Sequence, residues 1–306
     1  MKEKYIIISP CFNEEKVIAT FLETLENKLS STERFFTVVM VDDASTDSTP
    51  EILRKFKFAS ADFQLKVIRL NCNSGHQEAI RQGLMYAQRI VDNVSGIVVM
   101  DSDGEDDPNA IIELIKMKDF DIVFVARGKR HEGLKFKLGY FFYKILFKTI
   151  IGRNFTFGNY SLISPKVLNS LYTQKYFHYA AFLSKQKFDI QQIFFQRQKR
   201  IDGKSKMSYK SLVIHGLKSM IEYSEEILFF LMKFFLLIFL FLVSFGIYIL
   251  YSKFISHKAI LGWASSLGAN LVNACLIIMS TIILGLILLS IKNSLRQDSN
   301  NYHEIK

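Results

Sequence analysis

The chain has 306 residues, a formal net charge of +10 at pH 7 and a mean hydropathy of +0.16. This length suffices for one full domain and an appendage. A chain that is both basic and apolar indicates a membrane protein whose charge faces a phosphate-rich surface or substrate. The three cysteines, Cys11, Cys72 and Cys275, are too widely spaced for a disulfide framework or a metal-binding motif, which favours a reducing compartment. We expect no signal peptide, because the apolar run 5–8 is too short.

Apolar strands alternate with amphipathic helices in the first half of the chain. Strands are predicted over residues 5–8, 37–41, 65–70, 97–100 and 122–126. Helices are predicted over residues 14–29, 76–94 and 108–118, and a further helix begins near Pro50 with Asp47 or Ser48 as its cap. This alternation predicts an α/β fold whose mostly parallel sheet is covered by helices on both faces.

Polar residues gather where four of these predicted strands end. They are Asn13, Glu14 and Glu15, then Asp42 and Asp43, then Asn73 and His76, and finally Asp101 and Asp103. The carboxyl ends of parallel strands line the ligand crevice of open α/β sheets, so these residues are predicted to share one crevice. The crevice is not a dinucleotide site, because the first turn has no glycine, and the chain has no P-loop motif.

The strand 97–100 ends in two carboxylates, Asp101 and Asp103, followed by Gly104. Burying both carboxylates unpaired is costly, so a cation is their natural partner. Hard oxygen ligands favour Mg²⁺ or Mn²⁺, whose coordination shell a nucleotide diphosphate could complete. An isolated Asp-x-Asp is more often a solvated acidic turn before a helix such as the one that starts at Pro108. The three neighbouring strand ends shift the interpretation toward a metal site.

Four motifs follow one another along the chain. They are Pro10-x-Phe12-Asn13-Glu14-Glu15, Val41-Asp42-Asp43-x-Ser45-x-Asp47, Asn73-x-Gly75-His76 and Asp101-x-Asp103. Together they resemble the ordered motifs of inverting family-2 glycosyltransferases over about residues 4–215. Within that family the chain is most similar to polyprenyl-phosphate sugar synthases, the dolichyl-phosphate mannose synthase group. The resemblance implies an A-type glycosyltransferase fold and a nucleotide-sugar donor.

The resemblance also implies roles for single residues. Asp43 would contact the base, Asp101 the ribose or phosphate and the metal, and Asp103 the metal. Glu105 stands where the lipid-phosphate group usually has a glutamine that helps to hold the metal, and Cys72 stands where those enzymes often have an arginine. The expected donor site comprises Pro10, Phe12, Asn13, Glu15, Asp43, Asn73, His76, Asp101 and Ser102. The expected catalytic residues are Asp101, Asp103 and Asp106, and the expected metal ligands are Asp101, Asp103 and Glu105.

The middle of the chain is strongly basic, with eighteen Lys or Arg and only three acids over residues 127–210. No nucleic-acid-binding motif accompanies this charge, so we do not expect nucleic acid as a partner. Large aromatic residues and lysines are mixed over residues 134–151, which is typical of a helix that lies in a membrane interface. An amphipathic helix of the core is the alternative.

Two further segments resemble the lipid-phosphate group. Gly158-Asn159-Tyr160-Ser161-Leu162 corresponds to its Gly-Asp-Phe-Arg-Leu segment, with Asn and Ser replacing Asp and Arg. Arg197, Arg200, Gly203, Ser205 and Lys206 resemble the segment Arg-x-x-Gly-x-Ser-Lys, whose basic residues suit a phosphate. Acceptor or phosphate binding is therefore expected at Asn159, Arg197, Arg200, Ser205 and Lys206, with a solvated basic loop as the alternative. The Gln-x-x-Arg-Trp motif of processive polysaccharide synthases is missing.

Two apolar segments, 234–251 and 269–291, are long enough to cross a bilayer. Lys and Arg are more frequent at the outer ends of this pair than in the loop between, so the positive-inside rule places both outer ends in the cytoplasm. We predict a multi-pass protein of the cell inner (plasma) membrane. Its parts are a cytoplasmic glycosyltransferase domain (1–215), a juxtamembrane helix (216–233), the two transmembrane helices and a cytoplasmic tail (292–306).

The sequence thus predicts a membrane-anchored, metal-dependent inverting glycosyltransferase that moves a sugar from a nucleotide sugar, expected to be a UDP-sugar, to polyprenyl (undecaprenyl) phosphate, for cell-envelope glycan synthesis or modification. A phosphate acceptor is an anion near pH 7, whereas a sugar hydroxyl needs a general base. Between Asp121 and Asp202 the only acids are Glu132 and Asp189, and neither lies in a Glu-Asp pair.

Two alternatives stay open. One is transfer to a sugar hydroxyl of a lipid-linked glycan, with a base at Glu105, Asp106 or Asp107. The other is a catalytically inactive anchor protein of the same fold, which the intact Asp43, Asp101 and Asp103 disfavour. A nucleotidyltransferase would need a glycine-rich phosphate loop, and the chain has none. Membrane lipid is an expected partner, and a homo-oligomer is left open.

Overall fold

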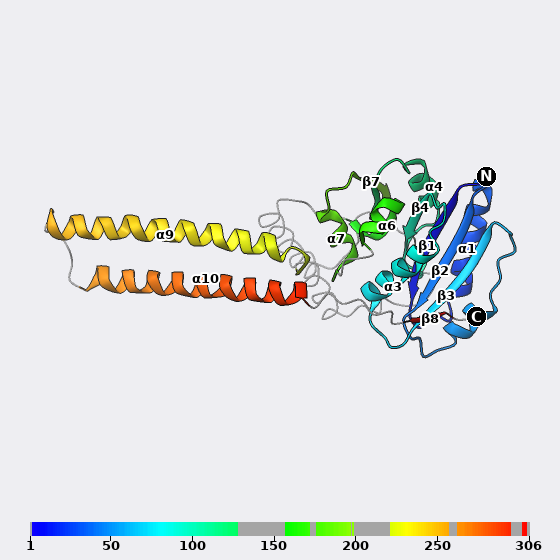
Figure 1. Cartoon of the computed structure of the whole chain (residues 1–306), viewed down its shortest axis with the longest axis horizontal. Helices are drawn as coiled ribbons and strands as arrows, with labels where there is room; N and C mark the ends of the chain where they lie inside the picture. Colours follow the sequence, from blue (N-terminus) through cyan, green and yellow to red (C-terminus); the bar gives the residue numbers. More distant parts are fainter. Residues whose placement is uncertain are drawn as a thin grey trace. The chain divides into compact units, whose positions relative to one another are not determined.

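The computed structural model describes residues 2–127, 157–171, 176–196, 198, 221–256, 262–294 and 302–304. These residues belong to two compact units, which we describe separately. One is an α/β unit built on an eight-stranded sheet, and the other contains two long helices (Figure 1). The predicted interfacial helix (134–151) and the predicted phosphate-binding residues Arg197, Arg200, Ser205 and Lys206 lie outside the described residues.

The sheet has the strand order β7-β5-β6-β4-β1-β2-β3-β8. Its strands are β1 (Lys4–Cys11), β2 (Phe35–Asp42), β3 (Phe63–Leu70), β4 (Gly96–Val99), β5 (Ile122–Arg127), β6 (Phe157–Ile163), β7 (Ile190–Phe195) and β8 (Tyr302–Glu304). The parallel pairs are β1 with β2, β1 with β4, β2 with β3 and β5 with β7, whereas β6 is antiparallel to β4 and β5, and β8 is antiparallel to β3. The mostly parallel α/β architecture and all five predicted strands are confirmed.

The helices of the α/β unit are α1 (Ile18–Leu29) with a 3₁₀ turn at Ser30–Thr32, α2 (Thr49–Lys55), α3 (His76–Arg89), α4 (Asn109–Lys116), α6 (Pro165–Leu171) and α7 (Tyr179–Lys185). The four predicted helices are present in the predicted order, and α6 and α7 were not predicted. Two predicted boundaries were wrong. The helix predicted from residue 14 begins at Ile18, after a turn over residues 15–17, and the N–H groups of Glu14 and Glu15 donate to Oγ1 of Thr49 in α2 and to Oδ2 of Asp47 in the loop before it. The helix predicted to residue 94 ends at Arg89, and Asn93 just beyond it has a left-handed backbone (φ 53°).

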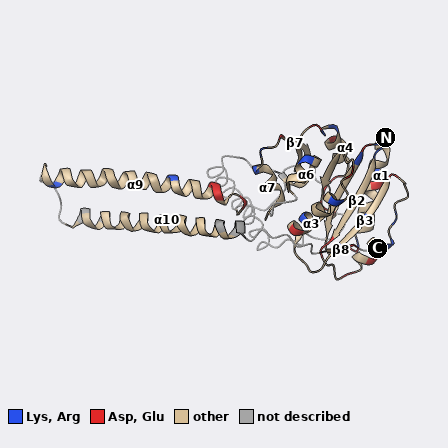
Figure 2. Cartoon of the chain, in the orientation of Figure 1, with Lys and Arg blue, Asp and Glu red and all other residues tan. Residues whose placement is uncertain are grey.

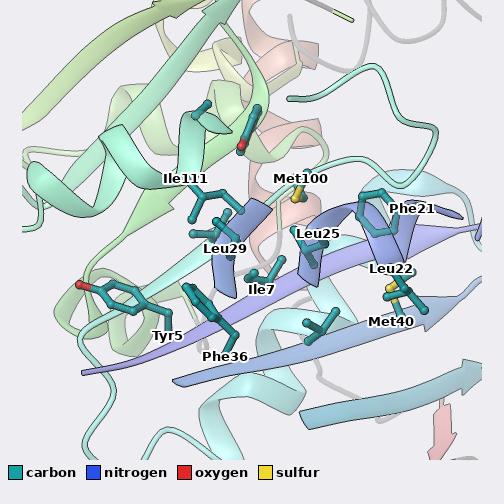
Figure 3. Close-up of a cluster of buried hydrophobic side chains, with 14 of the residues drawn as sticks. Tyr5, Ile7, Phe21, Leu22, Leu25, Leu29, Phe36, Met40, Met100 and Ile111 are labelled. Atoms are coloured by element: carbon teal, nitrogen blue, oxygen red, sulfur yellow. The ribbon is translucent and has the colours of Figure 1, made fainter. Parts of the chain in front are cut away.

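The core lies on both faces of the sheet, as the alternation of side chains along β1 requires. Tyr5 and Ile7 point to one face, where they pack with α1 and α4 around residues such as Phe21, Leu25 and Ile111 (Figure 3). Ile6 and Ile8 point to the other face and pack with residues of α3, α6 and α7. The two layers of helices fix the positions of the strand ends between them.

Helix α3 packs unusually close to the sheet. A Cβ atom at Gly83 would lie 2.5 Å from Cγ2 of Ile8 and 2.9 Å from Cγ2 of Val41, so a glycine is required there. The approach holds α3 across β1 and β2. Since α3 begins at His76, the same packing sets the place of that residue at the end of the sheet.

The second unit is a hairpin of α9 (Ser224–Phe254) and α10 (Trp263–Ser294). Segments 224–254 and 268–288 have mean hydropathies of 2.8 and 2.6, and by length and composition both are candidate membrane spans. Charged residues are sparse along both helices (Figure 2). A Cβ atom at Gly285 would lie 2.6 Å from Cδ2 of Leu228, so the helices pack closely where the glycine leaves room.

The predicted boundary between a juxtamembrane helix and the first span, at residues 233 and 234, falls inside α9. Residues 224–233 contain neither proline nor glycine, and the apolar run 227–232 favours continuation of the helix. One 31-residue helix therefore runs through this boundary, and the division into a juxtamembrane helix and a span stays a prediction.

Candidate active site

The four polar strand ends lie side by side, because β4, β1, β2 and β3 are neighbours in the sheet and run in one direction. Strand β6 runs the other way, and its residue Ser161 pairs with Val99 of β4. Asn159, two residues earlier on this antiparallel strand, is therefore level with Asp101. The four predicted strand ends thus share one edge of the sheet, and the crevice there stays a prediction.

Side-chain hydrogen bonds to the backbone join the loop after β1 to the loop after β2. The backbone N–H of Asn13 donates to Oγ of Ser45 at 2.9 Å, and Oδ1 of Asn13 accepts from the N–H of Thr46 at 2.8 Å. Asn13 has a left-handed backbone (φ 54°), which asparagine tolerates better than most residues. Asn13 therefore stabilises the loop conformation, in addition to any contact that it makes with a ligand.

Glu15 and Asp47 form a second link between the same loops. Oε2 of Glu15 accepts from the N–H of Ser48 at 3.1 Å, and Oδ2 of Asp47 accepts from the N–H of Glu15 at 3.2 Å. Ser48 occupies the N-cap position of α2 but its side chain makes no capping bond, and Oδ1 of Asp47 instead accepts from the N–H of Thr49, the first residue of the helix. Partial burial raises the pKa of Asp47, but the hydrogen bonds from Thr49 and Glu15 outweigh it and leave this pKa below its usual value.

Asp42 is fully buried at the end of β2 and is held by Arg69 of β3. Nε of Arg69 lies 3.3 Å from Oδ2 of Asp42, and Oδ1 of Asp42 accepts from the N–H of Ser45 at 3.0 Å. Arg69 also donates to the carbonyl of Ser45 at 2.8 Å. The local sequence of β3 does not reveal this role of Arg69, because nothing in it identifies a partner on β2.

Asp43 holds the loop that follows β3. Its two carboxylate oxygens accept from the N–H groups of Ser74 at 2.7 Å and Gly75 at 2.8 Å. Gly75 has a φ of 87°, a conformation that favours glycine. Burial raises the pKa of Asp43 and the charge of Asp42 adds to this, while the two backbone hydrogen bonds oppose it. Asp43 thus fixes the backbone of the 71–75 loop beside His76.

His76, the first residue of α3, faces Asp101 at the end of β4. Nε2 of His76 lies 2.8 Å from Oδ1 of Asp101. The backbone N–H of Asp101 donates to Oδ2 of Asp106 at 3.0 Å, and Oγ of Ser102 donates to the carbonyl of Pro10 at 2.8 Å. The structure therefore brings together His76, Asp101 and Asp106, and it ties the acidic loop (residues 101–107) to β1.

The acidic loop is folded back on itself. Oδ1 of Asp103 accepts from the N–H of Glu105 at 3.0 Å, while Glu105 is buried and its carbonyl accepts from the N–H of Gln198. Among the residues that the structure describes, no group of three or more His, Cys, Asp or Glu side chains is arranged to hold a metal ion. The predicted set of Asp101, Asp103 and Glu105 is thus not assembled by the protein alone. The two aspartates still fit a hard cation that takes its remaining ligands from substrate phosphates and water.

A buried polar network lies beside Asp101 and includes two residues that sequence analysis did not identify. Gln77 donates to Oδ1 of Asn159 at 3.4 Å and accepts from the N–H of Tyr179 at 2.6 Å. Oγ of Ser161 lies 2.9 Å from the hydroxyl of Tyr179. Gln77 follows His76 directly, which is the only local signal for its role. Asn159 is 7% exposed, so it presents little surface to a ligand.

The remaining predicted donor residues occupy the same edge. Phe12 is partly exposed in the loop after β1, and Asn73 is exposed in the loop after β3. Cys72 beside it is also exposed. The predicted donor residues thus lie at one edge of the sheet. Several of their side chains already make hydrogen bonds to the backbone of neighbouring loops.

The sequence matches the family described as Glycosyl transferase family 2 over residues 6–172. The uncharacterized glycosyltransferase YkcC of Bacillus subtilis is 34% identical over 173 residues, which cover 55% of this chain and 51% of YkcC. The uncharacterized glycosyltransferase YkoT of the same organism is 28% identical over 279 residues, which cover 85% of this chain and 79% of YkoT. The undecaprenyl-phosphate 4-deoxy-4-formamido-L-arabinose transferase of Salmonella choleraesuis is 28% identical over 136 residues, which cover 43% of this chain and 39% of the transferase. The chain therefore spans about half of the first relative and less of the third.

Solved structures share the fold. Mannosyl-3-phosphoglycerate synthase from Rubrobacter xylanophilus superposes with a TM-score of 0.52 at 12% identity and covers 73% of each chain. Glucosyl-3-phosphoglycerate synthase from Mycobacterium tuberculosis, in complex with Mn²⁺, UDP and phosphoglyceric acid, gives a TM-score of 0.51 at 13% identity, covering 74% of this chain and 78% of that one. At these identities the likeness establishes the fold alone, and it confirms the predicted A-type architecture.

Proposed function

The chain belongs to glycosyl transferase family 2, and we propose that it transfers a sugar from a UDP-sugar to polyprenyl phosphate with inversion at the reacting carbon. The observation that carries the proposal lies at the edge where β4, β1, β2 and β3 end side by side: Asp43 after β2 holds Gly75, and His76 next to Gly75 faces Asp101 after β4. A nucleotide base and a diphosphate need different surroundings, and this edge offers both. Polar loops follow β1, β2 and β3, and an acidic loop follows β4.

The nucleotide is proposed to lie on the loops after β1, β2 and β3. Hydrogen bonds among Asn13, Ser45 and Asp43 hold these loops before any ligand arrives. A prearranged loop avoids part of the entropic cost of ordering on binding. Each carboxylate oxygen of Asp43 can accept more than one hydrogen bond, so a contact with the base is compatible with its bonds to Ser74 and Gly75.

The diphosphate is proposed to lie against Asp101 and Asp103 with a divalent cation, Mg²⁺ or Mn²⁺. When bound, such an ion supplies positive charge that stabilises the departing nucleotide diphosphate. The glucosyl-3-phosphoglycerate synthase with the same fold is described with Mn²⁺ and UDP. Asp106 keeps Asp101 in place by accepting its N–H, and His76 contacts the Asp101 carboxylate from the side of α3.

The acceptor is proposed to be a lipid phosphate. One relative is named as an undecaprenyl-phosphate sugar transferase. Residues 127–210 supply eighteen positive side chains and only three acids, a balance that suits a phosphate. Transfer to a sugar hydroxyl needs a general base, and one candidate, Asp106, is 3% exposed and accepts the N–H of Asp101. These features favour the phosphate over the hydroxyl.

The hairpin of α9 and α10 is proposed to anchor the protein in the inner (plasma) membrane with the catalytic unit in the cytoplasm. Both helices are candidate spans, and Lys and Arg are more frequent outside the pair than in the loop between. Residues 302–304, which follow α10, form β8 in the sheet of the α/β unit. A chain that leaves this unit through α9 and returns to its sheet after α10 must cross a membrane an even number of times.

The function is tested with the purified full chain, undecaprenyl phosphate, Mg²⁺ or Mn²⁺ and a panel of radiolabelled UDP- and GDP-sugars. We expect label in a lipid product that mild acid releases, with about 10²–10³-fold less formed by Asp103→Ala. The variant Asp119→Ala, which alters an exposed acid on the surface, is the matched control and should keep full transfer. Transfer to a sugar hydroxyl on a preformed glycan, and not to the lipid phosphate, would contradict the proposal.

The topology is tested by cysteine labelling in a background without the native cysteines. A cysteine at Ser256, between the two helices, should react with an impermeant thiol reagent added outside the cell. A cysteine at Ser299, beyond α10, should react only after the membrane is permeabilised. The opposite pattern would place the catalytic unit outside the cytoplasm and refute the assignment.

A further inference from the structure

The strand β8, which we call the tail strand (Tyr302–Glu304), lies far from the rest of the sheet in sequence. It pairs in antiparallel fashion with β3, with Tyr302 opposite Leu70 and Glu304 opposite Ile68. Without it, β3 would be the edge of the sheet and would expose unpaired backbone groups. The tail strand therefore completes the side of the sheet that carries the 71–75 loop.

The tail strand also contacts helix α3 through its side chains. The Tyr302 ring packs edge-on against the Tyr86 ring at 6.0 Å, and the Arg89 guanidinium lies 5.6 Å from the Tyr302 ring centroid. Glu304 accepts from the Tyr86 hydroxyl at 3.2 Å and lies 4.0 Å from Nζ of Lys66 on β3. One short segment thus binds β3 by its backbone and α3 by its side chains.

These two elements flank the loop that the donor site uses. The 71–75 loop joins β3 to α3, and it carries Asn73 and the N–H groups held by Asp43. His303 of the tail strand lies opposite Arg69 in the sheet, and its ring Nδ1 is 3.4 Å from Oδ1 of Asn71 at the start of the loop. Arg69 in turn holds Asp42 on β2. The tail strand thus restrains the loop from the side opposite to Asp43.

We propose that the docked tail strand is a positioning element for the donor site, which raises donor affinity by holding β3 and α3 together around the 71–75 loop. This inference rests on the proposed function of that site as a nucleotide-sugar site. The tail strand acts through the loop and does not touch the donor. Its loss should therefore raise the KM for the donor and leave kcat nearly unchanged.

The energetics favour a tail strand that docks because it is tethered. A three-residue strand offers few backbone hydrogen bonds and one aromatic cluster, so as a free peptide it should bind weakly. Its attachment to α10 through residues 295–301 supplies a high effective concentration. A peptide added in trans should therefore replace the tail strand only at about millimolar concentration.

The first test removes residues 298–306 from the full chain or changes Tyr302→Ala. Because an aromatic contact of this kind contributes a modest free energy, we expect KM for the UDP-sugar to rise about three- to tenfold. The kcat should stay close to the value of the unaltered protein. Tyr302→Phe, which keeps the ring, is the matched control and should restore the original KM. A peptide with the sequence of Asp298–Lys306 should lower the KM of the deletion variant, and the same peptide with Tyr302→Ala should not.

The second test does not depend on activity. Amide hydrogen exchange at Ser74 and Gly75 should be faster in the deletion variant and should slow again with the peptide. Unchanged exchange and unchanged donor KM after the deletion would overturn the inference. A loss of kcat and thermal stability without a change in KM would overturn it as well, because it indicates a general structural role. If the unaltered protein transfers no sugar, the proposed function fails, and the exchange measurement still decides whether the tail strand restrains the loop.

Discussion

The two sides of the candidate site are built differently. On the proposed nucleotide side, in the loops after β1 to β3, four side chains each accept a hydrogen bond from a backbone N–H of a neighbouring loop: Asn13, Glu15, Asp43 and Asp47. In the acidic loop after β4, Asp101 instead meets the side chain of His76. The first arrangement ties loops from different strands together, and the second joins two side chains that a ligand can separate.

This difference between the two sides separates residues that stabilise the fold from residues that are proposed to take part in the transfer reaction. A side chain bonded to the backbone of another loop contributes to folding and to the shape of the site together. A partly buried carboxylate beside a histidine contributes little to folding, but it supplies the charge that a cation or a diphosphate responds to. We therefore expect substitutions on the nucleotide side to lower stability and donor affinity together, and substitutions of Asp103 to lower transfer alone.

The largest effect is expected for Asp103→Ala. Loss of the carboxylate that is proposed to hold the cation should lower kcat/KM by about 10²–10³-fold, because a bound metal stabilises the transition state by several kcal/mol. Tm should change little, since Asp103 is partly exposed and its described hydrogen bond lies within its own loop. Radiometric transfer and a thermal melt of the same preparation measure both quantities. Full activity in this variant would remove the functional distinction between the two sides.

Substitutions of Asp106 test whether this buried acid positions Asp101 or acts as a general base. Asp106→Ala frees the N–H of Asp101 and should lower kcat/KM about 10–100-fold, the range seen when supporting groups of a metal site are removed. Asp106→Asn keeps an acceptor oxygen and should retain most of the activity. If both variants are equally inactive, Asp106 is the general base and the acceptor is a hydroxyl.

Asp43→Ala should affect donor binding and folding together. The change leaves the N–H groups of Ser74 and Gly75 without their carboxylate, which we expect to cost about 1–3 kcal/mol of stability. The KM for the donor should rise in the same variant, and Asp43→Asn should lie between. If Tm and the donor KM changed independently of each other in these variants, the proposal that the nucleotide side is prearranged would be contradicted.

The smallest effect concerns Asp47, whose side chain accepts from the N–H of Thr49 at the start of α2. Asp47→Ala should lower Tm by about 2–4 °C at pH 7, as the loss of a capping hydrogen bond does. The pKa of Asp47 lies below its usual value near 3.9, so its contribution is present above that pH and is lost as pH falls through the lowered pKa. Tm values of the variant and the unaltered protein should therefore converge on acidification. Ser48→Ala, whose side chain makes no capping bond, is the control and should leave Tm unchanged.

The local pattern of the sequence determined the α/β alternation, five strands and the residues of the crevice. Runs such as 97–100 are apolar and β-branched enough to specify a buried strand, and the polar residue that ends each run marks the edge where the strands meet. The two apolar helices can also be predicted from the sequence, because their length and composition do not depend on tertiary contacts. These features depend on neighbours in sequence, so periodicity reveals them.

The tertiary structure decided which hydrogen-bond partners the residues at the strand ends have. Only the fold shows that the Asp43 carboxylate accepts hydrogen bonds from the 71–75 loop and that Asp106 accepts the N–H of Asp101. Only the fold shows that Gln77 bridges Asn159 and Tyr179. It also inserts β6 in reverse between β4 and β5 and docks the tail strand on β3. Each of these contacts joins groups that a local pattern does not relate. Hydrogen-bond partners of buried polar groups are set by which elements pack together, and packing is a property of the whole chain.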